Sequence, residues 1–222
     1  MEHRTILSMH FEKCGGTTLR YFWKKAFDEK EFFLYEPHIP QHQSSIEGIS
    51  RGDRKVSVIH GHYQYGLHEK IGTPCDYVCV FRDPVDRFIS HFNHWREWGQ
   101  APEGSGISGS KMTIEEFLDS KYCETIRNLM TKRLAGIPLG TPASADDFVK
   151  AKANLSTFAA VGSLHYLGNF GEELQRKFNL STGNANFRLN SQGRGTVRIK
   201  LPQAVIDKIS LLNYWDTQIA QE

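Results

Sequence analysis

The chain has 222 residues, of which 39% are hydrophobic and 12% are aromatic. A chain of this length and composition can bury a substantial core, and we expect one α/β domain over residues 1–222. The formal net charge of +2, with no run of lysines and arginines, argues against a nucleic-acid-binding protein. No secretory leader precedes the first motif, and no apolar run approaches the ~20 residues of a membrane span, so we expect a cytoplasmic protein without a membrane span.

The first predicted elements are a strand at 5–9, a glycine-rich loop and a helix. Apolar residues in this helix repeat at helical spacing, which is typical of a buried stripe: Leu19, Phe22, Trp23, Ala26 and Phe27. Residues 36–53 are rich in proline, histidine, glutamine, serine and glycine, and we expect an irregular connection there. Strands are predicted next at 55–59 and 77–81. The second of these is almost entirely apolar, as in a parallel sheet that is covered on both faces.

Asp83 and Pro84 predict the start of the next helix, because Asp is a good N-cap and Pro fits the first helical position. Residues 100–110 are rich in glycine and serine and form either a loop that gates a substrate or a plain surface linker. Further helices are predicted at 114–118, 122–134, 146–154, 168–178 and 203–214, with a strand near 158–161. The pattern predicts a P-loop-type three-layer α/β fold, with a central, mainly parallel sheet flanked by helices.

The segment HFEKCGGTT at 10–18 has the composition of an anion-binding loop at a helix N-terminus. Its candidate donors are the backbone of Gly15 and Gly16 and the side chains of Lys13, Thr17 and Thr18. The lysine precedes the glycines, whereas in nucleoside-triphosphate loops it follows them, and no strand ends in an obvious magnesium-binding aspartate. A phosphosulfate carries less charge than a triphosphate, so a lysine and backbone donors could stabilise its leaving phosphate without a metal ion. Sulfuryl transfer is therefore one hypothesis.

The four cysteines, Cys14, Cys75, Cys79 and Cys123, lack the common metal-ligand spacing, and we expect reduced thiols. On one strand, Cys75 and Cys79 would lie about 13 Å apart, at roughly 3.3 Å per residue, which is too far for a disulfide. Cys14 is placed at a predicted helix N-terminus. Either its thiol pKa is lowered there, or it is a small residue that points away from the ligand.

Three separated segments resemble the PAPS-dependent carbohydrate sulfotransferases, most closely the uronosyl (heparan sulfate) 2-O-sulfotransferase-like branch. PAPS is 3′-phosphoadenosine 5′-phosphosulfate. The first segment, HFEKCGGTTL at 10–19, is similar to the family's 5′-phosphosulfate loop, which commonly reads HIPKTGGTSL. Glu12 and Cys14 depart from that pattern. The resemblance implies that the cofactor is bound by Lys13, Cys14, Gly15, Gly16, Thr17 and Thr18.

The second segment, FRDPVDRFIS at 81–90, resembles the family's 3′-phosphate segment, in which an Arg and a Ser lie eight residues apart around a Pro. An arginine at a strand end supplies a forked pair of donors, and a serine two helical turns later can add a hydroxyl. We assign Arg82 and Ser90 to the 3′-phosphate on this basis. Arg87 is a further candidate, although a helix-surface arginine more often pairs with a nearby acid or faces solvent.

The third segment, NLMTKRLAG at 128–136, is similar to a family segment with N, T, R, L and G at matching places, except that Lys132 replaces the usual arginine. Its final glycine is also an ordinary helix C-cap. Near the C-terminus, RLNSQGRG at 188–195 resembles the loop that closes over the nucleotide, which implies that Ser191 and Arg194 bind the cofactor. Residues 211–216 resemble the family's terminal helix.

The best candidates for a catalytic base are His60 and His62 in VIHGHY at 58–63. Residues two apart on an extended backbone face the same way, so both imidazoles could project into one cleft beside the loop. A neutral histidine is suited to take a proton from a hydroxyl. The resemblance places the base at His62, with His60 as a positioning or second-choice base and Lys13 as the third catalytic residue. The alternatives are a metal pair, for which further ligands at a recognised spacing are missing, or two structural histidines.

These features predict an enzyme that transfers a sulfuryl group from PAPS to a hydroxyl, with PAPS as co-substrate and no metal. The acceptor implied by the resemblance is carbohydrate-like: a carbohydrate, a glycolipid or a small hydroxylated molecule. Adenosine 3′,5′-bisphosphate (PAP) would be the other product. Two alternatives stay open: a P-loop kinase-like phosphotransferase that prefers ATP with magnesium, and a noncatalytic nucleotide- or glycan-binding module.

Overall fold

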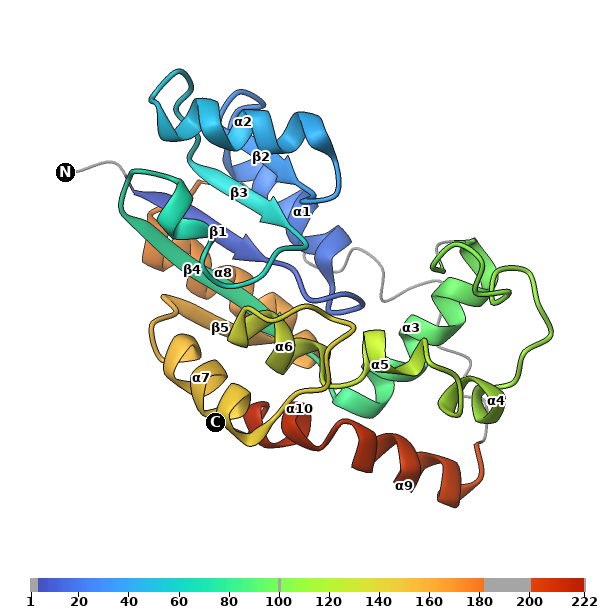
Figure 1. The fold of residues 1–222 in the computed structure, drawn as a ribbon. Coiled ribbons are helices and arrows are strands. Elements are labelled where there is room, and N and C mark those ends of the chain that lie inside the picture. The colour runs from blue at the N-terminus through green and yellow to red at the C-terminus, as the bar shows by residue number, and fades with distance from the viewer. Residues whose placement is uncertain (1–3, 100, 182–200, 222) are drawn as a thin grey trace.

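The computed structural model describes residues 4–99, 101–181 and 201–221. Its strands form one five-stranded sheet in the order β2-β3-β1-β4-β5, and every pair is parallel (Figure 1). The strands are β1 (Thr5–Met9), β2 (Phe32–Tyr35), β3 (Val58–Gly61), β4 (Cys75–Phe81) and β5 (Ala160–Ser163). Because all strands are parallel, their carboxyl ends meet at one edge of the sheet.

The helices connect these strands and extend the fold beyond them. In the first half they are α1 (Gly16–Ala26), α2 (Pro40–Ser50), η1 (Leu67–Lys70) and α3 (Pro84–Trp98). Four more follow: α4 (Ile114–Leu118), α5 (Cys123–Ile126), α6 (Leu129–Ala135) and α7 (Ala145–Leu155). The remaining ones are η2 (Leu164–Tyr166), α8 (Leu167–Phe178), α9 (Gln203–Leu212) and α10 (Tyr214–Ile219).

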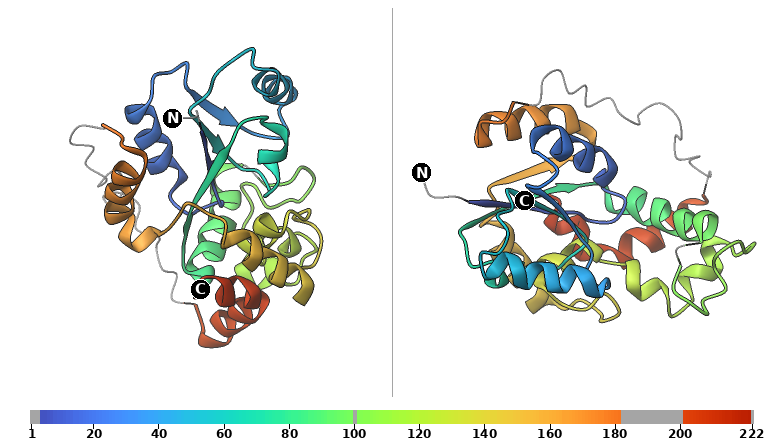
Figure 2. Two further views of the ribbon diagram at one scale, coloured as in Figure 1. Left: turned by 90° about the vertical axis from the view of Figure 1, so that its left-hand side faces the viewer. Right: turned by 90° about the horizontal axis from the view of Figure 1, so that it is seen from above.

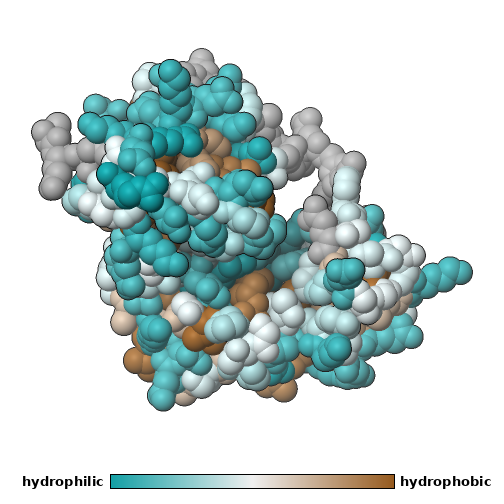
Figure 3. Space-filling model, turned by 45° about the horizontal axis from the view of Figure 1, so that its top comes forward, coloured by the Kyte–Doolittle hydropathy of each residue, from teal (hydrophilic) through white to brown (hydrophobic). Residues whose placement is uncertain are grey.

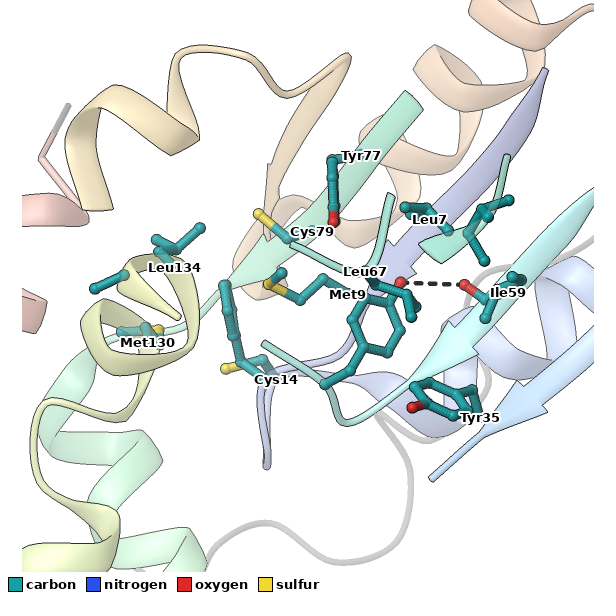
Figure 4. Packing of buried hydrophobic residues seen from close by; sticks show 14 of the residues in the cluster. Leu7, Met9, Cys14, Tyr35, Ile59, Leu67, Tyr77, Cys79, Met130 and Leu134 are labelled. Carbon is teal, nitrogen blue, oxygen red and sulfur yellow. Dashed lines mark hydrogen bonds between the residues drawn. The ribbon is translucent and has the colours of Figure 1, made fainter. Parts of the chain in front are cut away.

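Helices cover both faces of the sheet, which makes three layers (Figure 2). On one face, α1 and α8 pack against the strands through a buried cluster that includes Phe22, Trp23 and Phe170. On the other face, α2, α6 and α7 contribute to a second cluster around Leu7 and Met9 (Figure 4). Burial on both faces explains the apolar run at 77–81 in β4.

A third buried cluster lies beyond the carboxyl ends of the strands. It joins α3, α4 and α9 through residues such as Phe88, Phe92, Phe117 and Ile209. Figure 1 shows these helices to one side of the sheet, past the tips of β1 and β4. This part of the fold therefore forms a wall beside the edge where the strands end.

Several predicted elements are confirmed. The first strand has the predicted bounds, and α1 buries Leu19, Phe22 and Trp23 as the stripe indicated. Asp83 caps α3 by accepting a hydrogen bond from the backbone N–H of Asp86 at 2.8 Å. The fold class is likewise confirmed: a three-layer P-loop-type α/β fold around a parallel sheet.

The predicted irregular connection at 36–53 is wrong, because α2 occupies most of it. In this helix Ile46 and Ile49 are the buried residues, so the sequence carries little periodic signal. The strand predicted at 55–59 begins three residues later, at Val58. The predicted helix at 122–134 is broken into α5 and α6. The break is at Asn128, which has a left-handed φ of 47°. The closing helix is likewise divided, into α9 and α10 at Asn213.

Within the described ranges, no helix is both long and apolar enough to cross a membrane.

Candidate functional site

The candidate site lies where β3, β1 and β4 end side by side. The loop at 10–15 follows β1, His62 follows β3 and Arg82 follows β4, and the two outer strands both pair with β1. The chain leaves β1 toward β2 and β3 on one side, whereas β4 and β5 lie on the other. Such a switch point leaves a crevice at the carboxyl ends of the strands, which is where ligands bind in open α/β sheets.

Each of the two glycines of the loop is required for a different structural reason. Gly15 is the N-cap of α1 and has a φ of 81°, a left-handed conformation that favours glycine. A Cβ atom at Gly16 would lie 1.8 Å from Cε1 of His10, so the imidazole of His10 occupies the space that a side chain would need. The N–H of Thr18 in the first turn of α1 donates to the carbonyl oxygen of Gly15 at 3.0 Å. The N–H groups that precede it, at the very start of the helix, are those that a helix leaves available to an anion.

Two cations face the N-terminus of α1. Arg82 donates a hydrogen bond from Nη1 to the carbonyl oxygen of Lys13 at 3.1 Å, which holds the two residues together. Burial and the nearby Arg82 lower the pKa of Lys13, and burial lowers the pKa of Arg82. In the described part of the chain, neither side chain forms an ion pair. The nearby carboxylates, Glu97 for Lys13 and Asp86 for Arg82, raise these pKa values and offset the lowering only in part. Two partly buried cations beside a helix N-terminus are suited to bind an anion.

The other loop residues differ in what they can contribute. Thr17 is exposed at the start of α1, whereas Thr18 is buried. Cys14 is 1% exposed and belongs to the core cluster drawn in Figure 4. Its backbone N–H donates to the carbonyl of Phe11 at 3.1 Å, and burial raises the pKa of its thiol to about 12. The thiol of Cys14 is therefore a buried core side chain, as in the second of the two interpretations, and the assignment of Cys14 to the cofactor stays a prediction.

His62 lies at the edge of the site, and its side chain is 30% exposed. Its Nδ1 is 2.8 Å from Oε1 of Glu36, the residue that follows β2. The ring of His10 lies against it, with centroids 4.3 Å apart and planes tilted by 36°. Among the described residues, Nε2 of His62 has no hydrogen-bond partner. This nitrogen is thus the one available to a reacting group.

His60 does not share that access, because it is 2% exposed inside the layer between the sheet and α1. Its Nδ1 is 2.9 Å from the hydroxyl of Ser8, which accepts a hydrogen bond from Nε1 of Trp23 at 2.8 Å. Burial, and then the neighbouring His62, lower its pKa to about 3. The prediction that both imidazoles enter one cleft is wrong, and His60 is left as a positioning residue. Its ring stacks on His10 with centroids 5.4 Å apart.

On α3, Arg87 and Ser90 differ sharply. Arg87 is fully buried; it donates to the carbonyl of Ile126 and to Oδ1 of Asn213, and its Nε lies 3.8 Å from Oδ2 of Asp216. It therefore pairs with an acid, the alternative reading of this residue, and binds the C-terminal helices to α3. Ser90 is half-buried, and its hydroxyl has no hydrogen-bond partner within the described ranges.

The third sequence motif is structural at its centre. Lys132 is buried, and its Nζ donates to the carbonyl oxygens of Glu124 and Leu139 and to the carboxylate of Glu124, at 2.6 to 2.8 Å. The next residue, Arg133, pairs with Glu12 of the loop. Gly136 is the C-cap of α6, with a φ of 74°. Ser191 and Arg194 lie outside the described residues.

Sequence reasoning missed Glu36, His10 and the Glu12–Arg133 pair. Glu36 follows a strand that was not predicted, so nothing placed it at the carboxyl edge. Glu12 carried a signal, because it departs from the family pattern at a loop position. Among the described residues, no group of three or more His, Cys, Asp or Glu side chains is arranged to hold a metal ion.

The surface of the molecule is hollowed between the part that carries α2 and the part that carries α3 and α4 (Figure 3). Of the aromatic residues near the site, Tyr63 and Trp95 are buried in the core. Trp98, at the end of α3, is 54% exposed.

No protein-family model matches the sequence, and no curated protein matches it. Among solved structures, the crystal structure of mouse sulfotransferase SULT7A1 complexed with PAP matches with a TM-score of 0.50 and 14% identity, over 96% of this chain and 67% of the other. Retinol dehydratase in complex with androsterone and inactive cofactor PAP matches with a TM-score of 0.41 and 12% identity, over 99% of this chain and 81% of the other. Only the first score is high enough to indicate a common fold, and an identity this low indicates nothing more. The chain thus has the α/β fold seen in that sulfotransferase.

Proposed function

We propose that the chain is a PAPS-dependent sulfotransferase. The observation that carries the proposal is a pair of partly buried cations: Lys13, just before the N-cap of α1, and Arg82, which donates a hydrogen bond to the carbonyl oxygen of Lys13. An anionic donor would neutralise both and would accept hydrogen bonds from the first turn of the helix. The fold is shared with a sulfotransferase crystallised with PAP, which supports a donor of this class.

In the proposed reaction, Lys13 and the N–H groups of the loop hold the 5′-phosphate, and Arg82 and Ser90 hold the 3′-phosphate. His62 takes the proton of the acceptor hydroxyl at Nε2. The hydroxyl oxygen forms a bond to sulfur while the bond from sulfur to the 5′-phosphate oxygen breaks, and the electron pair of that bond leaves with PAP. Lys13 stabilises the charge that develops on this oxygen, which is where a preorganised cation lowers the barrier most.

We further propose a carbohydrate-like acceptor: a carbohydrate, a glycolipid or a small hydroxylated molecule. This part rests on the resemblance of the His60-Gly61-His62 segment to the uronosyl branch, which carries a histidine base in such a segment. The half-exposed position of His62, at the edge of the sheet, fits attack by a hydroxyl that approaches from solvent. Ser191 and Arg194 stay proposed cofactor contacts, on resemblance alone.

The test is calorimetric binding of PAP, ADP and ATP with magnesium to the wild type and to Arg82→Ala. We expect tight binding of PAP alone, weakened about 10- to 100-fold by the substitution, the cost of one or two charge-assisted hydrogen bonds. Arg51→Ala is the matched control, because Arg51 is an exposed arginine whose partner is Asp53. Preference for ATP with magnesium would overturn the proposal and favour a kinase-like phosphotransferase.

Binding without turnover would indicate a noncatalytic module. Transfer of labelled sulfate from PAPS to a panel of saccharides, glycolipids and small alcohols therefore completes the test. Transfer to any of them confirms the enzyme, and the class of product identifies the acceptor.

A further inference from the structure

We propose that Glu36 is a positioning residue that fixes the tautomer and the ring orientation of His62. The proposal rests on the proposed function, in which His62 takes a proton at Nε2. Glu36 was absent from the residues that the sequence singled out. Its role follows from where β2 and β3 end.

The two residues are brought together by strand register. Tyr35 at the end of β2 pairs with Gly61 at the end of β3, and Glu36 and His62 are the next residues along each chain segment. A Cβ atom at Gly61 would lie 1.8 Å from the carbonyl oxygen of Tyr35, so the close approach of the strands requires glycine at this position. The glycine between the two histidines thereby places the imidazole of His62 beside the carboxylate.

The contact determines which ring nitrogen carries the proton. Oε1 of Glu36 is 2.8 Å from Nδ1 of His62, and the two side chains are 17% and 30% exposed. An ionised carboxylate can only accept hydrogen bonds. In the neutral imidazole, Nδ1 must therefore be the donor, and Nε2 keeps the lone pair that a general base needs. Without the carboxylate, the other tautomer would place the proton on Nε2 and block the reaction.

Glu36 and His62 are themselves supported. The backbone N–H of Glu36 donates to Nδ1 of His42 at 2.9 Å, which fixes the chain where it leaves β2. His10 packs against the ring of His62 on another side. Burial, and then the neighbouring His62, hold the pKa of His10 well below its ordinary value, so this ring is neutral. The carboxylate would also stabilise the imidazolium that forms when His62 takes the proton.

The first experiment measures the tautomer of His62 directly, by long-range proton–nitrogen NMR correlation at about pH 8, where histidines of ordinary pKa are neutral. His62→Gln identifies its signals. We expect a protonated Nδ1 and an unprotonated Nε2 in the wild type, and a shift toward the Nε2–H tautomer in Glu36→Gln. Glu31→Gln is the matched control at the other end of β2, where Oε1 of Glu31 accepts a hydrogen bond from Ser57 at 2.6 Å.

The second experiment compares turnover and PAP binding in the same variants. We expect Glu36→Gln to lower kcat by about 10²- to 10⁴-fold, the range for loss of an oriented base, with PAP affinity unchanged. A wild-type His62 with its proton on Nε2 would overturn the proposal, and so would an unchanged tautomer in Glu36→Gln. If the wild type fails to bind PAP, the proposed function falls, whereas the tautomer measurement still decides the role of Glu36. The wild-type tautomer is read without a Glu36 variant, so a Glu36→Gln protein that fails to fold would not prevent the test.

Discussion

The guanidinium of Arg133 on α6 is paired with the carboxylate of Glu12 in the loop that follows β1, with Nε 3.3 Å from Oε2. Both side chains are largely buried, at 9% and 18% exposure. Burial by itself would raise the pKa of Glu12, but the charge and hydrogen bond of Arg133 outweigh it and hold that pKa well below its usual range. The pair ties the loop to a helix that is distant in sequence, and the loop geometry depends on it.

Glu12→Gln should therefore lower the free energy of unfolding by about 3 kcal/mol, because it leaves a buried guanidinium without its counter-ion. Since the pKa of Glu12 is depressed in the folded state, its contribution is present above the unfolded pKa of about 4.3 and is lost as the pH falls below that value. The wild type should lose more stability than Glu12→Gln on acidification below about pH 5. Urea unfolding at a series of pH values measures both effects.

The control for this pair is Asp53→Asn, which removes the exposed partner of Arg51. A solvent-exposed ion pair contributes little, so this change should alter stability by less than about 0.5 kcal/mol. Equal effects of the two substitutions would show that the Glu12–Arg133 pair does not stabilise the loop.

Gly61→Ala should disrupt the edge of the sheet at β2 and β3. The new methyl group would meet the backbone oxygen of Tyr35 at 1.8 Å, and backbone cannot move aside as a flexible side chain can. We expect a loss of about 3 kcal/mol or more in unfolding free energy, together with loss of the His62–Glu36 contact. Gly48→Ala, within α2, is the control and should stabilise by roughly 0.5–1 kcal/mol. A stable Gly61→Ala protein would mean that the two strands can separate without cost.

The elements predicted well are those with one clear period or a strong cap. The stripe of α1 and the Asp83 cap of α3 are local signals, and both were confirmed. Strand β2 and helix α2 were missed because their stability comes from tertiary packing: β2 pairs with β3, and α2 buries just two isoleucines. Asn128 broke a predicted helix because its side chain is buried against Asp216, a contact far away in sequence.

The sequence predicted those site residues whose type and spacing alone indicate their chemistry. Lys13, the two glycines and Arg82 are recognisable as an anion-binding set, and the fold brings them together. The alternation of side chains along a strand predicted that His60 and His62 share one face of β3. However, β3 ends at Gly61, between the two histidines. His60 is thus buried against Ser8, whereas His62 lies past the strand end. Predicting a partner such as Glu36 requires the order of the strands in the sheet, which no local sequence pattern reveals.

Cys14 should behave as a core residue rather than as a reactive thiol. Burial raises its pKa to about 12, so at about pH 8 almost none of it is thiolate, the reactive form. Iodoacetamide should modify the half-buried Cys75 first and should leave Cys14 unmodified until the protein unfolds. Mass spectrometry of the peptides identifies which cysteine is modified. Rapid alkylation of Cys14 in the folded protein, suppressed by PAP, would instead place its thiol in the ligand site.

His62→Ala should lower kcat for sulfuryl transfer by about 10²- to 10⁴-fold, the range for loss of a general base. PAP affinity should stay unchanged, because His62 serves the acceptor and not the phosphates. The control is His68→Ala, which removes a half-buried histidine bonded through Nδ1 to the hydroxyl of Tyr77 at 3.1 Å. Near-normal turnover in His62→Ala would exclude it as the base.

Buried histidines should make the protein sensitive to mild acid. His60 and His91 both have a pKa of about 3, caused first by burial. In the unfolded state these histidines titrate near pH 6.5. Between about pH 3 and pH 6.5 the unfolded state therefore binds more protons than the folded state, so the free energy of unfolding should fall as the pH drops through this range. Replacing either histidine by leucine should make this fall less steep.

At about pH 7 the two substitutions should differ in sign, because only one histidine has a partner to lose. Nδ1 of His91 has no hydrogen-bond partner in the described part of the chain, so His91→Leu should be neutral or stabilising. His60→Leu removes a hydrogen-bond partner of the buried hydroxyl of Ser8 and should cost about 1–3 kcal/mol. Denaturant unfolding at both pH values separates the two effects. A large loss in His91→Leu at neutral pH would reveal a polar partner of His91, and a neutral His60→Leu would show that the Ser8 hydroxyl finds another partner.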